Sequence, residues 1–381
     1  MKNKLKVMTI LGTRPEIVRL SRVMALLDKY VNHVVVHTGQ NYDYELNEIF
    51  FKELRVRMPD HFLGIDCSSL GNIYGNTLIA VEKVLLKEKP DAVLILGDTN
   101  SAIAGIIAKR MMIPIYHMEA GNRCFDFNVP EEINRRIVDH ISDFNLVYTE
   151  HARRNLLAEG IPARRIYLTG SPMREVLDFY KERISESGIL EKLGLNEKEY
   201  FVVSMHREEN VDNKDHLLAL LNSLNGLAKK YELPIIVSTH PRTKKRLGAL
   251  TKFVFNSRIQ FLKPFGFLDY VALQQNAFCV ISDSGTIGEE SSILDFPAIT
   301  MRNAMERPEA MDSGNIILTG LQPETIENAV DLITKEHQAG KGQRIPFEYE
   351  ISNTSSRVVK LIVGTAKLSH IWDNIITKEK R

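Results

Sequence analysis

The chain alternates short apolar runs with longer amphipathic stretches, and this alternation constrains its fold more than any other feature. Between the apolar runs of the first half lie stretches with apolar residues at helical spacing, such as 17–29, 75–87 and 101–110. A strand, a helix and a second strand in succession are typical of a parallel sheet. The predicted strands are Leu5–Leu11, His33–His37, Ala92–Gly97, Ile113–Met118 and Phe144–Tyr148.

The same pattern restarts near residue 200, with helical stretches at 216–231 and 269–276. The chain has 381 residues, which is enough for two domains of ordinary size. We therefore predict an α/β fold of two doubly wound, Rossmann-like domains with a cleft between them. The predicted strands of the second half are Tyr200–Met205, Pro234–Thr239, Ile259–Leu262, Ala277–Ser282 and Ala298–Met301.

Glycine and proline in Gly170-Ser171-Pro172 predict a linker between the two domains. The predicted domains are residues 1–171 and 172–354. The last stretch, 355–381, has helical apolar spacing at its start. By analogy with two-domain enzymes of this kind, we expect it to complete the first domain.

Composition excludes several classes of function. The 49 Lys and Arg residues nearly balance 48 Asp and Glu residues, so a strong attraction to nucleic acid or to a membrane surface is not implied. No apolar run approaches the roughly 18 residues of a membrane span. Cys67, Cys124 and Cys279 lack CxxC spacing, which indicates neither a zinc site nor a redox pair. We expect a soluble cytoplasmic protein without a metal.

Two acidic residues follow neighbouring predicted strands of the first half. Asp98 comes directly after the run 92–97, and Glu119 comes directly after 113–118. Open α/β sheets place their chemistry at the carboxyl ends of strands, which favours an acid or base at each position. The alternative for Asp98 is that Asp98 or Thr99 caps the next helix. Helix capping would account for one of these two acids but not for both.

Two further segments of the first half carry arginine beside a helix start. Pro130 opens a predicted helix that contains Glu131 and Arg135, which either act on a substrate or pair on one helix face. The loop GTRPE after the first strand combines a glycine with Arg14 at a helix N-terminus. It is either an anion site or a plain turn with a surface arginine. It is not GxGxxG, so nothing favours a nicotinamide cofactor.

The second half offers groups suited to phosphate. His206 and His240 each lie just beyond a predicted strand, where a histidine can bind a phosphate, although a lone histidine is more often structural. The turn Ser284–Thr286 leads into a predicted helix, whose N-terminal amides can cradle a phosphate. Glu290 is placed to accept hydrogen bonds from ribose hydroxyls, and Arg307 adds positive charge. Nucleotide binding is thus expected in the second half and sugar chemistry in the first.

Eight motifs in this order resemble the non-hydrolysing UDP-N-acetylglucosamine 2-epimerase family. They are GTRPE, GDTNS, EAGNR, PEEINRR, a strand-end HRE, THPR, DSGTIGEE and MERPE, and the resemblance runs from residue 5 to about residue 310. It implies a glycosyltransferase-B-like fold with the active site between two Rossmann-like domains, and a homodimer. The expected activity is inversion at carbon 2 of a UDP-N-acetyl-hexosamine by elimination and re-addition of UDP, without a cofactor.

The resemblance also assigns roles to residues. Asp98, Glu119 and Glu131 are the implied acid and base groups, and His206 is the implied essential histidine near the diphosphate. The implied substrate-binding residues are Arg14, Arg19, Arg135, His240, Ser284, Gly285, Thr286, Glu290 and Arg307. Arg19 stands where the family often has lysine, and Gly285-Thr286 stands where it has Gly-Gly.

The chain departs from the commonest family pattern after Glu119, where it has GNRCFD and a loop about two residues shorter. Together with HTGQNYD at 37–43, this sequence resembles one branch of the family. That branch converts UDP-2-acetamido-2,6-dideoxy-L-talose into UDP-N-acetyl-L-fucosamine, which is used for surface polysaccharide. Gln40-Asn41 replaces a Gln-His associated with allosteric activation by UDP-N-acetylglucosamine, so that activation is in doubt. The alternatives are a UDP-N-acetylglucosamine epimerase, a UDP-sugar glycosyltransferase, a hydrolysing epimerase and a non-catalytic nucleotide-sugar sensor.

Overall fold

The computed structural model describes residues 4–39, 50–250, 252–340 and 344–373, which form two compact units. Unit 1 contains residues up to 178 and from 351 onward, and unit 2 contains residues 179–350. The boundary falls inside helix α7 (Met173–Ser185), later than the predicted linker. The first half of α7 belongs to unit 1 because Glu175 accepts a 2.8 Å hydrogen bond from the amide of Ser355.

Unit 1 contains a seven-stranded sheet of order β3-β2-β1-β4-β5-β6-β7 in which every pairing is parallel. All five predicted strands are present. β3 and β7 were not predicted, because runs of two or three residues carry no readable pattern. The strands are β1 (Lys6–Leu11), β2 (Asn32–His37), β3 (His61–Phe62), β4 (Ala92–Leu96), β5 (Ile115–Met118), β6 (Phe144–Val147) and β7 (Ile166–Leu168).

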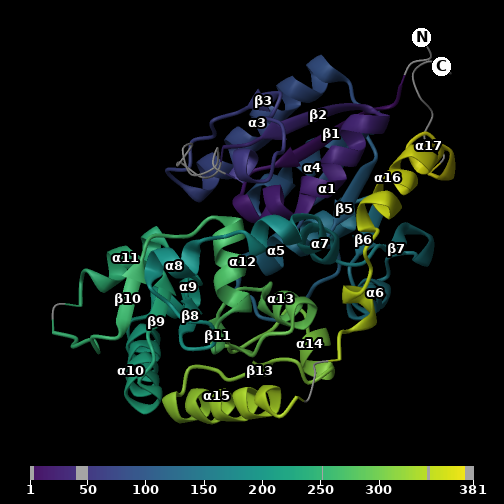
Figure 1. Cartoon of the computed structure of the whole chain (residues 1–381). Coiled ribbons are helices and arrows are strands. Elements are labelled where there is room, and N and C mark those ends of the chain that lie inside the picture. The colour runs from purple at the N-terminus through teal and green to yellow at the C-terminus, as the bar shows by residue number, and fades with distance from the viewer. Residues whose placement is uncertain (1–3, 40–49, 251, 341–343, 374–381) are drawn as a thin grey trace. The chain divides into compact units, whose positions relative to one another are not determined.

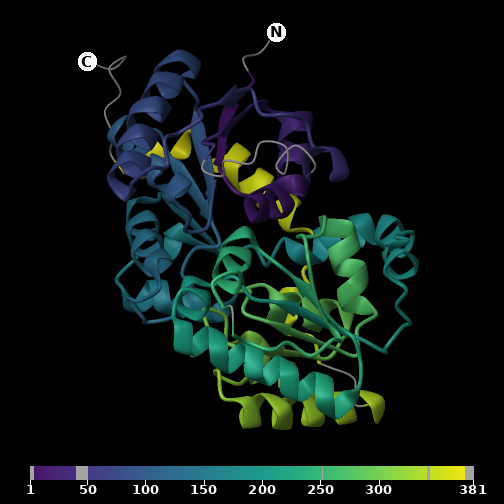
Figure 2. The same ribbon diagram turned by 90° about the vertical axis from the view of Figure 1, so that its left-hand side faces the viewer.

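Helices cover both faces of this sheet. Apolar residues of α3, α4 and α5 share one buried cluster with strands β1, β2, β4 and β5. Helices α1 and α16, far apart in the sequence, lie side by side in unit 1 (Figure 2). The return of the C-terminal segment to unit 1 is therefore seen up to residue 373. The helices are α1 (Arg14–Tyr30), α3 (Leu70–Glu88), η1 (Asn100–Ala104), α4 (Gly105–Arg110), α5 (Pro130–Ile141), α6 (Glu150–Ala158), η2 (Ala163–Arg165), α16 (Thr354–Thr365) and α17 (Leu368–Trp372).

Unit 2 contains a six-stranded parallel sheet of order β10-β9-β8-β11-β12-β13 (Figure 1). Its strands are β8 (Phe201–Ser204), β9 (Ile235–Ser238), β10 (Ile259–Leu262), β11 (Cys279–Ser282), β12 (Ala298–Thr300) and β13 (Ile317–Leu318). Only the two-residue β13 was not predicted. The leucine-rich face of α10 and the buried face of α15 close the main apolar core against the sheet. The predicted α/β class with two parallel sheets is confirmed.

The helices of unit 2 are α8 (Ile189–Leu193), α9 (Glu208–Val211), α10 (Lys214–Tyr231), α11 (Pro241–Leu247), α12 (Phe267–Gln275), α13 (Ile287–Leu294), α14 (Glu309–Asp312), α15 (Pro323–Gln338) and η3 (Phe347–Tyr349).

Each sheet reverses its strand order at one point, between β1 and β4 in unit 1 and between β8 and β11 in unit 2. Loops that leave two such strands at their carboxyl ends diverge to opposite faces, which opens a crevice where ligands of open α/β sheets bind. The loops after β1 and β4 carry the GTRPE and GDTNS motifs. The loops after β8 and β11 carry His206 and the Ser284–Thr286 turn. The strand order thus brings four of the eight motifs to these two places.

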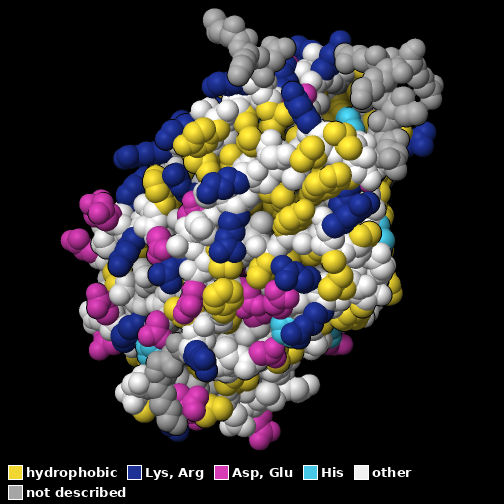
Figure 3. Space-filling model, turned by 90° about the vertical axis from the view of Figure 1, so that its right-hand side faces the viewer, with side chains coloured by type: hydrophobic (Ala, Val, Ile, Leu, Met, Phe, Trp, Pro, Cys, Tyr) yellow, Lys and Arg dark blue, Asp and Glu magenta, His cyan; other side chains and the backbone are white. Residues whose placement is uncertain are grey.

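Within the described ranges, every helix is either too short or too polar to span a lipid bilayer. Helices α16 and α17 keep Val363, Leu368 and Ile371 exposed. Figure 3 looks onto the side that carries these helices, and hydrophobic side chains are interspersed there with Lys and Arg.

His37, the last residue of β2, gives a test of this packing. Its ring is fully buried and stacks on Phe62 with ring centroids 5.1 Å apart. Burial lowers the pKa of His37 from 6.5 to about 4. As the pH falls, the unfolded chain therefore binds a proton before the folded chain does. The stability that His37 contributes is complete above about pH 6.5 and is lost as the pH falls toward 4.

We predict that His37→Asn flattens the loss of unit 1 stability between pH 6.5 and 4, by at most about 3 kcal/mol. Denaturant titrations can follow the fluorescence of Trp372, the single tryptophan of the chain, which lies in unit 1. His140→Asn is the control, because His140 is exposed. An unchanged pH slope in His37→Asn would contradict the prediction.

Candidate active site

Asp98 and Glu119 lie at neighbouring strand ends of unit 1. Leu96 of β4 is in register with Met118 of β5, so these two strands end at the same level of the sheet. Gly97 and Glu119 then both adopt positive φ, at 70° and 67°. A methyl group at Gly97 would lie 3.8 Å from Oε2 of Glu119. The left-handed backbone is uncommon for a glutamate and stores strain, as often happens where a side chain is held for function.

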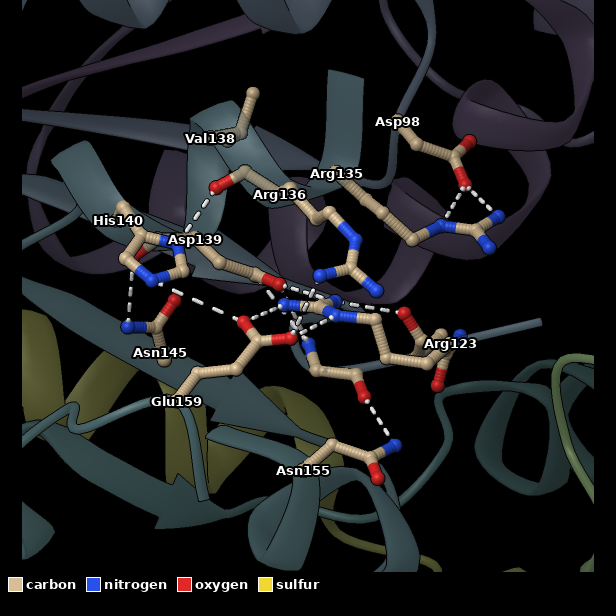
Figure 4. Close-up of polar contacts among 12 residues, drawn as sticks. Asp98, Arg123, Arg135, Arg136, Val138, Asp139, His140, Asn145, Asn155 and Glu159 are labelled. Atoms are coloured by element: carbon tan, nitrogen blue, oxygen red, sulfur yellow. Dashed lines mark hydrogen bonds and ion pairs between the residues drawn. The ribbon is translucent and has the colours of Figure 1, made fainter. Parts of the chain in front are cut away.

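Each of these acids is paired with a buried arginine. Nε of Arg135 donates to Oδ2 of Asp98 over 3.0 Å, as Figure 4 shows, and Nη1 of Arg19 donates to Oε2 of Glu119. The arginine side chains are 4% exposed, whereas the side chains of Asp98 and Glu119 are 20% and 14% exposed. We call these four residues the acid cluster. Arg19 and Arg135, expected to bind substrate, are here the partners that orient the two acids.

The capping alternative for Asp98 does not describe the structure, because its carboxylate is bound to Arg135. Thr99 is the N-cap residue of η1, but its hydroxyl donates to Glu16 over 3.3 Å. Asn134 of α5 donates to the carbonyl oxygen of Asp98 over 3.0 Å. The backbone and the side chain of Asp98 are therefore both held by α5.

Glu131, the third expected acid, is the second residue of α5 and is half-buried. Its neighbour Glu132 is fully buried and accepts hydrogen bonds from Arg135 and Arg136 over 3.0 and 3.1 Å. Glu132 also accepts from the amide of Cys124 over 3.2 Å, which ties the loop after Glu119 to α5. Sequence reasoning missed Glu132, although its spacing to the two arginines on one helix was a readable signal.

Glu16 holds the GTRPE loop by accepting hydrogen bonds from backbone amides of that loop. The carboxylate of Glu16 is buried and accepts from the amides of Gly12 and Thr13 over 3.0 and 2.8 Å, and burial raises its pKa to about 7. A side chain at Gly12 would collide with the hydroxyl of Ser101, so the glycine makes room for a protein contact rather than for a ligand. Arg14 is half-buried, with its guanidinium 5.7 Å from the ring centroid of Phe50.

In unit 2, a buried carboxylate organises the loop after β8. Asp283 accepts hydrogen bonds from the amides of His206 and Arg207 over 2.9 and 3.0 Å, and its Oδ1 lies 3.1 Å from Nδ1 of His206. Burial alone would raise the pKa of Asp283, but the charge of His206 and these hydrogen bonds outweigh it and lower the pKa. The contact places Nδ1 of His206 toward Asp283 while the side chain stays 40% exposed. Such a histidine is oriented for a ligand phosphate.

The Ser284–Thr286 turn opens helix α13. The hydroxyls of Ser284 and Thr286 lie 3.0 Å apart, and the amide of Thr286 donates to Ser284 over 3.3 Å. A side chain at Gly285 would come within 3.0 Å of Glu306 and 3.4 Å of Arg207. The turn is thus closely packed against the ion pair of Arg207 and Glu306, whose atoms lie 3.4 Å apart, and the backbone amides at the N-terminus of α13 suit an anion.

Two residues expected to bind substrate in unit 2 have buried protein partners. Arg307 is 5% exposed, binds Glu289 and donates to the carbonyl oxygen of Gly285 over 3.4 Å. Arg307 therefore holds the Ser284–Thr286 turn through the backbone of Gly285. Glu289 was not among the residues predicted from the sequence. Glu290 is 8% exposed and accepts from Gln274 over 2.7 Å, so Gln274 orients this carboxylate.

His240 is exposed and caps α11, with Nδ1 accepting from the amide of Arg242 over 3.3 Å. Its ring centroid lies 6.2 Å from that of His206, so both expected histidines belong to one region. Gln40 and Asn41, which bear on allosteric activation, lie outside the described residues. Among the residues that the structure describes, no group of His, Cys, Asp and Glu is arranged to hold a metal ion.

Comparisons with known proteins show which family this chain is similar to. The family model of UDP-N-acetylglucosamine 2-epimerase matches residues 25–363. The UDP-N-acetylglucosamine 2-epimerase structure from Rickettsia bellii is 49% identical, with a TM-score of 0.89 and 96% and 98% of the two chains covered. A UDP-N-acetylglucosamine 2-epimerase of Methanococcus maripaludis is 40% identical over 95% of this chain and 99% of its own.

A third relative differs in its sugar. The UDP-2,3-diacetamido-2,3-dideoxy-D-glucuronate 2-epimerase of Pseudomonas aeruginosa is 32% identical over 94% of this chain and 99% of its own. Similar chains of nearly full length therefore act at carbon 2 of different UDP-sugars. With the family model matching most of its length, this chain belongs to the UDP-N-acetylglucosamine 2-epimerase family.

Proposed function

We propose that the chain inverts carbon 2 of a UDP-N-acetyl-hexosamine by eliminating and re-adding UDP. The observation that carries the proposal is the acid cluster, in which Asp98 and Glu119 stand at adjacent strand ends, each oriented by a buried arginine. Positioned carboxylates of this kind transfer protons, and each such group typically contributes about 10²–10⁴-fold to a rate.

The chemistry explains why an anion site is needed as well. The hydrogen on carbon 2 is not acidic, because no carbonyl group activates it. Expulsion of UDP from carbon 1 builds positive charge next to that C–H bond, and loss of the proton then gives a 2-acetamidoglycal with UDP still bound. Return of the proton on the other face, with re-formation of the bond to UDP, inverts carbon 2.

We assign the leaving diphosphate to unit 2. His206 and the Ser284–Thr286 turn supply donors for it, and Arg207 adds a positive charge beside the turn. Preorganised donors of this kind stabilise charge that develops on a leaving group. Asp98, Glu119 and Glu131 serve the sugar of the same substrate. Arg14 adds a further cation from the GTRPE loop.

For the sugar, we propose UDP-2-acetamido-2,6-dideoxy-L-talose, with UDP-N-acetyl-L-fucosamine as the product. The sequence of the loop after Glu119 differs from the usual sequence in the family. In this loop, Phe125 and Phe127 are 70% and 68% exposed. A 6-deoxy sugar presents a methyl group, which suits an apolar surface better than a hydroxyl does. UDP-N-acetylglucosamine is the second candidate, because the Rickettsia and Methanococcus relatives are named for it.

Proton NMR in D₂O tests both the proposed reaction and the proposed sugar. The purified protein is incubated with each UDP-sugar in turn, without acceptor, metal or nicotinamide. Deuterium at carbon 2 of an epimeric product supports the epimerase, and the substrate with the larger kcat/KM identifies the sugar. Absence of exchange with both would contradict the proposal and favour a glycosyltransferase or a nucleotide-sugar sensor. Release of free N-acetylmannosamine would indicate a hydrolysing enzyme.

Glu119→Gln is predicted to lower the rate of deuterium exchange at least about 10²-fold, because it removes a proton-transfer group. UDP binding, measured by calorimetry, is expected to stay within about threefold because UDP is assigned to unit 2. Glu82→Gln, a change of an exposed glutamate on α3, is the matched control. A near-normal exchange rate in Glu119→Gln would rule Glu119 out as an acid or base.

His206→Asn tests the assignment in unit 2. Asparagine can keep a donor toward Asp283 but has no counterpart of the outer ring nitrogen, so we expect kcat to fall about 10²-fold or more. His337→Asn on α15 is the control. If turnover and UDP affinity both remained normal, His206 would have no role at the diphosphate.

A further inference from the structure

His117 is a buried histidine that the proposed mechanism does not use. It lies on β5, two residues before Glu119, and its side chain is 0% exposed. Nε2 lies 2.8 Å from the carbonyl oxygen of Gly97, and Nδ1 lies 2.9 Å from Oδ1 of Asp139. Gly97 directly precedes Asp98. The one imidazole thus joins the strand end that carries Asp98 to a carboxylate on α5.

Both neighbours of this ring are hydrogen-bond acceptors. A carbonyl oxygen accepts only, and Asp139 already accepts from the amide of Gly121 over 3.2 Å and from Nη1 of Arg123 over 2.7 Å. Burial would raise the pKa of Asp139, but His117 and Arg123 outweigh it, so the pKa lies below its usual range. Asp139 is therefore an anion. The 2.9 Å contact of Nδ1 with Asp139 lacks the angles of a hydrogen bond, but an anion at this distance, together with an acceptor at Nε2, favours a proton on each ring nitrogen.

The same carboxylate anchors the chain after Glu119. Gly121 donates its amide to Asp139, and its carbonyl oxygen accepts from Asn155 of α6 over 3.0 Å. A side chain at Gly121, whose φ is 81°, would lie 2.4 Å from the carbonyl oxygen of Ala152. The turn that presents Glu119 therefore has its position fixed by Asp139 and α6.

Alternating charges continue from Asp139 back to the acid cluster. Arg123 binds Glu159 through two hydrogen bonds of 2.8 and 2.6 Å, and Glu159 lies 3.3 Å from Arg136. Arg136 binds Glu132, which binds Arg135, which binds Asp98. Figure 4 shows much of this chain. In order, it comprises His117, Asp139, Arg123, Glu159, Arg136, Glu132, Arg135 and Asp98.

Charge balance supports the doubly protonated ring. With His117 charged, the eight groups of this chain contain four cations and four anions. With His117 neutral, these eight groups would carry one net negative charge in a largely buried network, where the nearest further titratable group is the exposed His140, 3.8 Å from Glu159. An unbalanced buried charge is costly, because the protein interior solvates it poorly.

We propose that His117 is a positioning residue for the acid cluster, acting as an imidazolium that joins the backbone before Asp98 to the carboxylate that anchors the backbone after Glu119. One buried group thereby sets the spacing of two acids on adjacent strands. Misplacement of a reacting group by about 1 Å can cost about 10²-fold in rate, so a loss of this contact is expected to lower kcat. The activity readout rests on the proposed epimerase function.

Asparagine and glutamine separate the two contacts of His117. The amide of Asn resembles Nδ1 and can donate to Asp139, whereas the amide of Gln resembles Nε2 and can donate to Gly97. We expect His117→Asn and His117→Gln each to lower kcat for deuterium exchange about 10-fold to 10²-fold, and His117→Phe, which keeps neither contact, to lower it further. KM and UDP affinity are expected to stay within about threefold, because UDP is assigned to unit 2.

His370→Gln is the matched control, because His370 is a half-buried histidine of unit 1 whose Nε2 lies 2.7 Å from the carbonyl oxygen of Met112. It is expected to keep the parent kcat. Folded His117 variants with a parent-like kcat would overturn the proposal. So would an equal loss of kcat and UDP affinity, which would indicate a general structural role. Failure of the parent protein to exchange deuterium would instead overturn the proposed function.

A second measurement uses the unaltered protein and does not depend on activity. Nitrogen NMR of ¹⁵N-histidine-labelled protein reports whether each ring nitrogen carries a proton. The signals of His33 and His37, the other buried histidines, are identified through His33→Asn and His37→Asn. Two protonated nitrogens on His117 would support the proposal. One unprotonated nitrogen would overturn it.

Discussion

The site in unit 1 depends on the contacts of one buried carboxylate, that of Asp139. It meets His117 from β5, Arg123 from the following loop and the amide of Gly121 just beyond Glu119. A carboxylate without water needs such partners to stay charged, and it therefore fixes the position of each of them. The strained backbone of Glu119 is held between β5 and this anchor. The orientation of the acids that we propose to be catalytic thus follows from the solvation of a buried charge.

The proposed reaction has two separate requirements, and we assign one to each unit. Removal of a non-acidic hydrogen needs a good leaving group, and UDP leaves only where its charge is stabilised. We assign this need to His206, Arg207 and the Ser284–Thr286 turn of unit 2. Unit 1 contributes carboxylates that arginines hold in fixed orientations. The same reversal of strand order creates both places, so one topological rule serves two kinds of chemistry.

Much of this arrangement could be predicted from the sequence, because apolar runs and polar strand ends are local signals. The neighbouring positions of Asp98 and Glu119 followed from the strand pattern alone. The partners of the arginines did not, since Arg19 reaches Glu119 and Arg135 reaches Asp98 across long stretches of chain. Arg307 looked like a ligand contact for the same reason, whereas it pairs with buried Glu289. β3 and β13 escaped prediction because a two-residue strand has no periodicity.

In the proposed reaction, carbon 2 loses its proton only when the bond between carbon 1 and UDP breaks. The most direct test places ¹⁸O in the bridge between carbon 1 and the β-phosphorus and follows its position by phosphorus NMR in D₂O. The account predicts that ¹⁸O moves into non-bridging β-phosphoryl positions in the same molecules that gain deuterium at carbon 2. Retention of ¹⁸O in the bridge while deuterium enters would contradict elimination and would require direct removal of the proton.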